Sequence, residues 1–85
     1  MRAKNLSDAH QFAIEARQFP AVVEVDVYER PDKPGSNRMN GDVVVMCAKR
    51  SFYFAFPASG PYSPGAMMDR LRDALTPAPK PQRKK

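Results

Sequence analysis

Hydrophobic residues follow two different periods along this chain, and these periods divide it into helices and strands. From Ser7 to Phe19 they recur every three or four positions, which predicts an amphipathic helix. Ser7 suits the N-cap position, and Pro20 is expected to end the helix because the residue before a proline avoids the helical region. Residues 1–6 show no pattern and are expected to form a short basic lead.

A period of two replaces the helical period between Ala21 and Glu29 and predicts a half-buried strand. Its inward face is predicted to carry Val23, Val25 and Val27, and its outward face Glu24, Asp26 and Tyr28. Residues 31–37 contain two prolines and Gly35, which tolerates positive φ, and are expected to form a long, mobile loop. Asn40-Gly41 is a second turn signal.

Residues 41–57 hold the densest run of β-branched and aromatic side chains, and we interpret this run as a β-hairpin. One register places Cys47 opposite Phe52, Val45 opposite Phe54 and Val43 opposite Phe56. A three-residue loop would instead pair Ala48, Met46 and Val44 with the same phenylalanines. In either register the three phenylalanines point inward and form the core.

A second amphipathic helix is predicted after the hairpin, with Ser63 as N-cap, Pro64 at the first position and Pro77 after the end. Its apolar stripe is predicted to be Met67, Met68, Leu71, Ala74 and Leu75. The sequence therefore predicts a two-layer α+β domain in residues 1–76, with a three-stranded antiparallel sheet packed against two helices in the order α-β-β-β-α. Residues 77–85 are rich in proline, lysine and arginine and are expected to form a disordered basic tail.

The third predicted strand raises a problem of exposure. In a simple meander it lies at the edge of the sheet, and a long apolar edge promotes aggregation. A helix or loop shields it, or the first strand pairs with it, or a second copy of the chain docks there. The last alternative predicts a homodimer.

The composition of the chain limits which cellular compartment and which kinds of partner are expected. The net charge is +5, but Lys80, Arg83, Lys84 and Lys85 supply four of the 14 basic residues, so 10 basic and 9 acidic residues remain in 1–76. The single cysteine, Cys47, has no partner for an internal disulfide, which favours a reducing compartment. The sequence shows no leader with an apolar core and no span of about 18 apolar residues. We therefore expect a soluble cytoplasmic protein that does not enter a membrane.

The sequence shows no pattern typical of a catalytic or cofactor site. His10 and Cys47 stand apart and are too few for a metal cluster, and no glycine-rich loop has the spacing that cradles phosphate. Asp69 and Asp73 alternate with arginines and are expected to form a solvated helix face. We expect neither enzymatic activity nor a metal or other cofactor.

Two binding surfaces remain as hypotheses, and the first is cationic. Lys49 and Arg50 at the hairpin tip, with the four basic residues of the tail, would grip a phosphate backbone without reading sequence. The order of elements also resembles that of the double-stranded-RNA-binding domain. That family carries a lysine-rich motif at the start of its second helix, where this chain has Pro64-Gly65-Ala66-Met67-Met68.

The second surface is the sheet face turned away from the helices. It is predicted to present Val22, Glu24, Asp26, Tyr28, Val44, Met46, Tyr53 and Ala55. Tyrosine and methionine are enriched in protein interfaces, and Tyr28 and Tyr53 are the predicted anchors. The leading hypothesis is a small non-catalytic protein-binding module, an inhibitor or adaptor of a nucleic-acid-handling complex, similar in size and style to phage proteins such as anti-CRISPR proteins. The alternative is a nucleic-acid-binding accessory protein.

Overall fold

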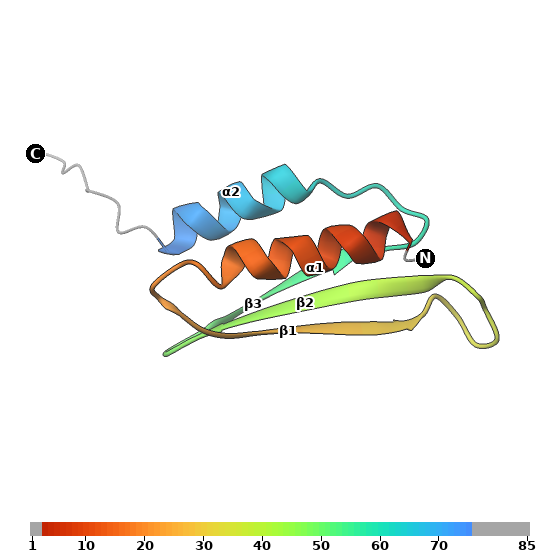
Figure 1. Ribbon diagram of the computed structural model, residues 1–85, viewed down its shortest axis with the longest axis horizontal. Coiled ribbons are helices and arrows are strands. Elements are labelled where there is room, and N and C mark those ends of the chain that lie inside the picture. Colours follow the sequence, from red (N-terminus) through yellow and green to blue (C-terminus); the bar gives the residue numbers. More distant parts are fainter. Residues whose placement is uncertain (1–2, 76–85) are drawn as a thin grey trace, which may run out of the picture.

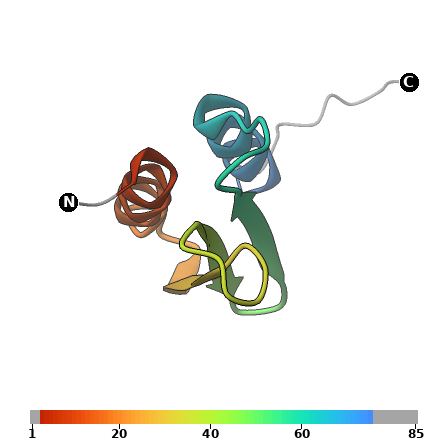
Figure 2. The same ribbon diagram turned by 90° about the vertical axis from the view of Figure 1, so that its right-hand side faces the viewer.

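Two helices and one sheet make up the part of the chain that the computed structural model describes, residues 3–75 (Figure 1). The elements are α1 (Lys4–Ala16), β1 (Val22–Pro31), β2 (Met39–Cys47), β3 (Ser51–Phe56) and α2 (Pro64–Leu75). The strands are antiparallel in the order β1-β2-β3, and both helices lie on the same face of the sheet (Figure 2). The predicted α+β fold class and element order are confirmed. The predicted tail, residues 77–85, lies outside the described residues.

Helix α1 begins earlier than the sequence pattern predicted. It starts at Lys4, Ala3 is the N-cap residue, and no side chain caps the first turn. The expected patternless lead is therefore wrong: Asn5 is 7% exposed, and its Nδ2 donates hydrogen bonds of 2.9 Å to the carbonyls of Met39 and Phe56. A polar side chain can occupy this buried position because it is bonded to the ends of two strands. The helix ends at Ala16, before the predicted end at Phe19.

The Asn40-Gly41 pair does not form the predicted turn. Both residues lie within β2, where Gly41 is buried directly under α1. A Cβ built on Gly41 would lie 3.1 Å from the Cβ of Ala9 and 3.3 Å from Cδ2 of Leu6. Glycine is required here by the close approach of the helix. Gly35 is the residue that takes the left-handed conformation, with φ of 77°, as predicted for the β1–β2 loop.

A bulge in β1 changes the predicted inward set of side chains. The register between β1 and β2 shifts between Val22 and Glu24. Val23 is consequently 71% exposed instead of inward, and Val22 packs against the core instead of lying on the outer face. Val25 and Val27 point inward as predicted. A bulge adds one residue without changing the hydrophobicity of the sequence, so alternation alone gave the wrong faces at this end.

The hairpin between β2 and β3 has neither of the two registers considered from the sequence. Val45 pairs with Phe52 and Val43 with Phe54, because the chain turns over only Ala48 and Lys49. The turn closes with a 2.8 Å hydrogen bond from the Cys47 N–H to the Arg50 carbonyl. Relative to the first register the strand has moved by two residues. Such a shift keeps every side chain on its predicted face.

The core lies between the sheet and both helices, and its centre is aromatic. Phe12 of α1 contacts Phe54 and Phe56, with ring centroids 4.9 and 5.6 Å apart. Leu71 and Met68 of α2 complete the cluster, which confirms the predicted stripe of this helix at its two buried positions. Ser63 also caps α2 as predicted, its Oγ accepting a hydrogen bond from the Ala66 N–H at 3.2 Å. The inward phenylalanines are therefore confirmed as the centre of the fold.

The contact between Gly41 and α1 predicts how a single methyl group changes stability. Gly41→Ala is expected to lower the free energy of unfolding by about 1–3 kcal/mol, because the new Cβ must push α1 away from β2. Urea denaturation followed by circular dichroism measures this loss. Gly65→Ala is the matched control and should not lower stability: apart from chain neighbours and the backbone of α2 itself, no atom lies within 4 Å of the added Cβ, and alanine favours a helix over glycine. Equal stability of wild type and Gly41→Ala would contradict the argument.

Candidate functional site

One whole face of the sheet is left uncovered by the helices (Figure 2). We call it the open sheet face, and register and alternation assign to it Glu24, Asp26, Tyr28, Arg30, Asp42, Val44, Met46, Ser51, Tyr53 and Ala55. All six residues proposed from the sequence as a protein-binding set lie on this face. Val22, which was expected there, packs against the core instead.

The tyrosines of the open sheet face lie on opposite edge strands. Tyr28 of β1 is 53% exposed and Tyr53 of β3 is 57% exposed. Between them, Val44 of β2 pairs with Tyr53 on one side and with Asp26 on the other. Val44 and Met46 are half-buried, and Met46 lies one row beyond Val44, between Glu24 and Ser51. The arrangement presents apolar, aromatic and acidic groups on a hydrogen-bonded scaffold.

A buried carboxylate that the sequence analysis missed holds this face together. Asp42 of β2 is 6% exposed and accepts hydrogen bonds from Arg30 Nε on β1 and from the Tyr53 hydroxyl on β3, the latter at 2.7 Å. One side chain therefore links all three strands. In the sequence, the only sign of this role is that Asp42 directly precedes the valine run of a predicted strand. Its partners are known only once the register of the strands is known.

These contacts set the pKa values of the network. Burial alone would raise the pKa of Asp42, but hydrogen bonds from Arg30 and Tyr53 outweigh burial and bring it below its ordinary value. The hydrogen bond to Asp42 also raises the pKa of Tyr53. Asp42 is thus ionised and Tyr53 protonated at neutral pH. The hydrogen bond from the Tyr53 hydroxyl to Asp42 therefore fixes the position of the tyrosine ring.

Of the six cationic residues proposed from the sequence, Lys49 and Arg50 lie within the described residues. Arg50 folds back from the hairpin tip: its Nη2 donates a 2.5 Å hydrogen bond to the Ala74 carbonyl, and its guanidinium lies 5.0 Å from the centre of the Phe52 ring. Arg50 therefore caps the C-terminal end of α2. Lys49 is exposed and has no ion-pair partner within residues 3–75. Lys80, Arg83, Lys84 and Lys85 lie outside the described residues.

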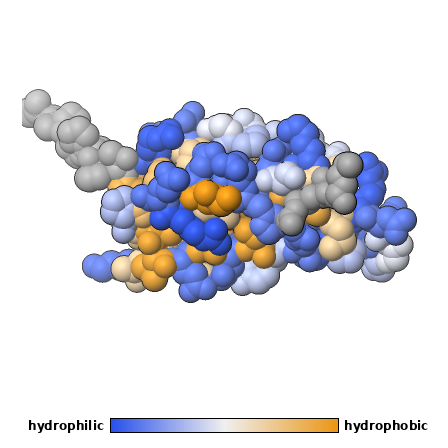
Figure 3. Space-filling view, in the orientation of Figure 1, coloured by the Kyte–Doolittle hydropathy of each residue, from blue (hydrophilic) through white to orange (hydrophobic). Residues whose placement is uncertain are grey.

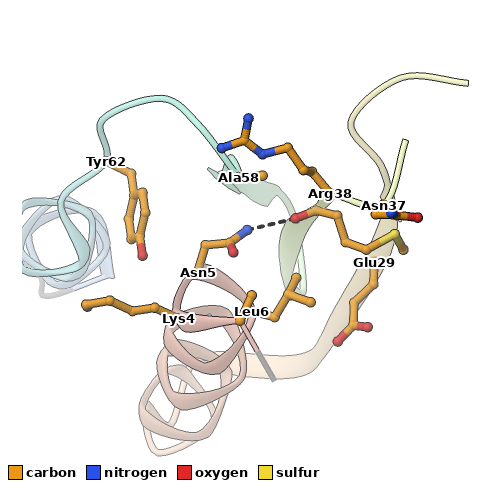
Figure 4. Close-up of a pocket in the computed structure, with 10 residues that line it drawn as sticks. Lys4, Asn5, Leu6, Glu29, Asn37, Arg38, Ala58 and Tyr62 are labelled. Carbon is orange, nitrogen blue, oxygen red and sulfur yellow. Dashed lines mark hydrogen bonds between the residues drawn. The ribbon is translucent and has the colours of Figure 1, made fainter. Parts of the chain in front are cut away.

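A groove lies beside the start of α1 and the end of the β1–β2 loop (Figure 4). This end groove has a volume of about 950 Å³ and is lined by Ala3, Lys4, Asn5, Leu6, Glu29, Asn37, Arg38, Met39, Ala58 and Tyr62. Several of its polar groups already have partners. The Tyr62 hydroxyl and Lys4 Nζ both contact Oδ2 of Asp8, at 2.6 and 3.0 Å.

The pKa values at the end groove follow from burial and from Asp8. Burial, followed by the hydrogen bond to Asp8, raises the pKa of Tyr62 to about 12. The pKa of Asp8 is lowered by hydrogen bonds from Tyr62 and Lys4. A tyrosine with so high a pKa remains protonated at neutral pH and is not a base. These contacts serve to hold the first turns of α1 against the segment that leads into α2.

Histidine and cysteine do not meet in this fold. His10 Nε2 lies 2.7 Å from Oε2 of Glu29, whereas Cys47 lies in β2 near the hairpin tip and is half-buried. Among the described residues no group of three or more histidines, cysteines, aspartates or glutamates is placed to hold a metal ion. No helix within residues 3–75 is long and apolar enough to cross a membrane.

Comparisons with protein-family models, with curated proteins and with solved structures found no match for this chain.

The Asp42 network predicts an acid-dependent loss of stability. Because the folded state lowers the pKa of Asp42, its contribution is full above the carboxyl pKa of the unfolded chain, about 4, and is lost as the pH falls further. Asp42→Asn should lower the free energy of unfolding at pH 7 by about 1.5–3 kcal/mol and flatten its decline below pH 4. Urea denaturation at a series of pH values measures both effects.

Asp69→Asn is the matched control for this measurement. Asp69 is exposed and pairs with Arg72 three residues along α2, so its removal should change stability by less than about 1 kcal/mol. If Asp42→Asn were as stable as wild type at pH 7, the network would have no structural role.

Proposed function

We propose that this protein is a small non-catalytic binding module that attaches to another protein through the open sheet face. The observation that carries the proposal is the pair of half-exposed tyrosines, Tyr28 and Tyr53, on a sheet whose other face is fully used by the helices. Tyrosine buries a large apolar area while its hydroxyl still finds a polar partner. Such residues are the usual energetic anchors of protein interfaces.

The Asp42 network supports the proposal because it prepares one anchor in advance. Tyr53 donates its hydroxyl hydrogen bond to Asp42, which is itself bonded to Arg30. A side chain held in one position before binding loses less conformational entropy in the complex. Tyr53 therefore offers an exposed ring at a low entropic cost.

The charges of the face indicate the chemistry of the partner. Glu24 and Asp26 lie on the open sheet face, and neither has an ion-pair partner within the described part of the chain. Next to them, Val44 and Met46 supply half-buried apolar surface. A partner that carries basic side chains around an apolar centre would complement this arrangement.

The wider role that we propose is that of an inhibitor or adaptor of a nucleic-acid-handling complex in the cytoplasm. Its support is the sequence: the net charge of +5 is concentrated in the final residues, which could add contacts to a nucleoprotein partner. In size and style the chain is similar to phage inhibitors, including anti-CRISPR proteins. The alternative function is direct binding of a phosphate backbone through Lys49, Arg50 and the tail.

The test compares capture of partners by wild type and by a variant that carries both Tyr28→Ala and Tyr53→Ala. Loss of two anchors, each worth about 2 kcal/mol, should reduce capture more than a hundredfold. A photo-crosslinker at Ala55 should label the captured protein directly. Ile14→Ala is the matched control, because Ile14 is 50% exposed but lies on α1. Tyr53→Phe, which keeps the ring, separates loss of the anchor from loss of the Asp42 hydrogen bond.

Nuclease treatment and deletion of residues 77–85 decide between the two functions. If the open sheet face binds the partner, capture should survive both treatments. If capture is abolished by either one and is unaffected by the double tyrosine change, the protein binds nucleic acid instead. A double variant that folds normally and captures the same partner as wild type would refute the role of this face.

A further inference from the structure

Within the described residues, strand β3 has a hydrogen-bonded neighbour on one side only. The order β1-β2-β3 leaves its outer side without a strand, and the hydrogen bond from Cys47 to Arg50 sets which residues face outward. In antiparallel pairing Phe52 and Phe54 exchange hydrogen bonds with β2. The N–H and C=O groups of Ser51, Tyr53 and Ala55 therefore point away from the sheet, and nothing within residues 3–75 pairs with them.

The other edge of the sheet is obstructed. The outward carbonyl of Val25 on β1 accepts a 3.1 Å hydrogen bond from Arg17 Nη2, and Pro31 at the end of the strand has no N–H to offer. The bulge after Val22 interrupts the same edge. Bulges, prolines and covering side chains are the devices by which proteins block edges. Strand β3 carries none of them in Ser51–Phe56.

The position of α2 decides what can occupy the β3 edge. Helix α2 lies over β3, beside α1 (Figure 2), and Arg50 ties its last turn to the start of the strand. A second copy that paired its own β3 here would place its strand about 4.8 Å away. It would bring its α2 to a similar separation, whereas packed helices need 8–10 Å. A single extended segment has no helix to clash, so the edge favours a strand over a second folded copy.

Apolar and charged groups beside the edge define the sequence that would fit. Phe52 and Met67 are half-buried on the helix side, so residues of an added strand that point this way should be apolar. On α2, Gly65, Met68, Asp69 and Arg72 line a groove shared with α1. Helical periodicity puts Arg70 on the other flank, above the β3 edge.

The cationic groups gather at one end of this edge. Lys49 and Arg70 have no ion-pair partner within the described residues. Arg50 reaches the Ala74 carbonyl, one turn beyond Arg70 on α2, and Asp73 is the carboxylate three residues after Arg70. A strand added antiparallel to β3 has its C-terminal end at the hairpin tip, because β3 begins there. Acidic residues that follow the apolar part of the segment would therefore meet these cations.

We propose that the β3 edge binds an extended segment of a partner protein as a fourth antiparallel strand, with alternating apolar residues followed by acidic ones. This inference rests on the proposed protein-binding function and adds the form of the partner. The backbone groups of Ser51, Tyr53 and Ala55 supply up to six hydrogen bonds to the added strand. The segment has no proline opposite these three residues, because proline has no N–H to donate.

The hydrophobic surface elsewhere is consistent with this assignment. On the side of the molecule seen in Figure 3, hydrophobic residues form separate patches divided by hydrophilic ones. Ile14 and Val23 are exposed apolar side chains away from the β3 edge, and each is isolated in its position on α1 or β1. Single exposed apolar residues are normal for a protein surface.

The probe is the fluorescently labelled peptide Thr-Val-Thr-Val-Thr-Glu-Glu. Its third residue, which is the central one of its three threonines, is designed to pair with Tyr53. Fluorescence anisotropy measures its binding to the full chain. Ala55→Pro removes one outward N–H that β2 does not use, and should weaken binding at least tenfold. Ala55→Ser keeps that N–H and should bind as wild type does. Circular dichroism establishes that both variants are folded.

Two changes in the peptide and one spectroscopic readout sharpen the test. N-methylation of the central threonine, or replacement of both glutamates by lysine, should each weaken binding. In two-dimensional NMR the peptide should shift the amides of Ser51, Tyr53 and Ala55 and slow their hydrogen exchange, leaving Val27 on the β1 edge unchanged. Binding that tolerates Ala55→Pro, or shifts confined to β1, would overturn the proposal.

Two further outcomes separate this proposal from the others. Tyr28→Ala should weaken capture of the partner and leave peptide binding unchanged, so failure of the open sheet face and failure of the edge are distinguishable. Light scattering at high concentration should give the monomer mass of 9.5 kDa. A mass twice as large that falls to the monomer value with Ala55→Pro would assign the edge to a second copy and overturn the proposal.

Discussion

The close contact between α1 and the central strand β2 determines the rest of this structure. Ala9, Ala13 and Ala16 are fully buried on α1, and Gly41 on β2 has no side chain to keep the helix away. Small residues let the two backbones approach, and the large rings of Phe12, Phe54 and Phe56 pack together beside them, under α2. Once α1 occupies this face, α2 can only lie beside it over β3. Within residues 3–75, the opposite face and the outer side of β3 are left without cover.

Polar groups stabilise a chain whose core is small. Asn5 joins the ends of β2 and β3 to α1, and Asp42 joins the three strands across the open sheet face. Within residues 3–75 no buried side-chain nitrogen or oxygen lacks a hydrogen-bond partner. Each of these two side chains is costly to bury alone and favourable to bury when paired. They therefore specify the arrangement of the strands as well as stabilise it.

The two proposed binding surfaces follow from this one-sided packing and meet at β3. Tyr53 contributes its ring to the open sheet face and its outward backbone groups to the free edge. A partner that added a strand beside β3 would extend the face on which Tyr28 and Val44 lie. Backbone hydrogen bonds, which any extended segment can form, would then supply affinity. Side-chain contacts would supply specificity for one partner sequence.

The sequence by itself determined the elements, their order and the inward direction of Phe52, Phe54 and Phe56, because the period of hydrophobic side chains is a local property. It also placed both tyrosines on the outer face. Only the tertiary structure decided the start of α1 at Lys4, the exposure of Val23 and the register of β3, since these depend on contacts between distant residues. A strand shifted by two residues has the same hydrophobic pattern, so alternation could not reveal that Asp42 lies within reach of Arg30 and Tyr53.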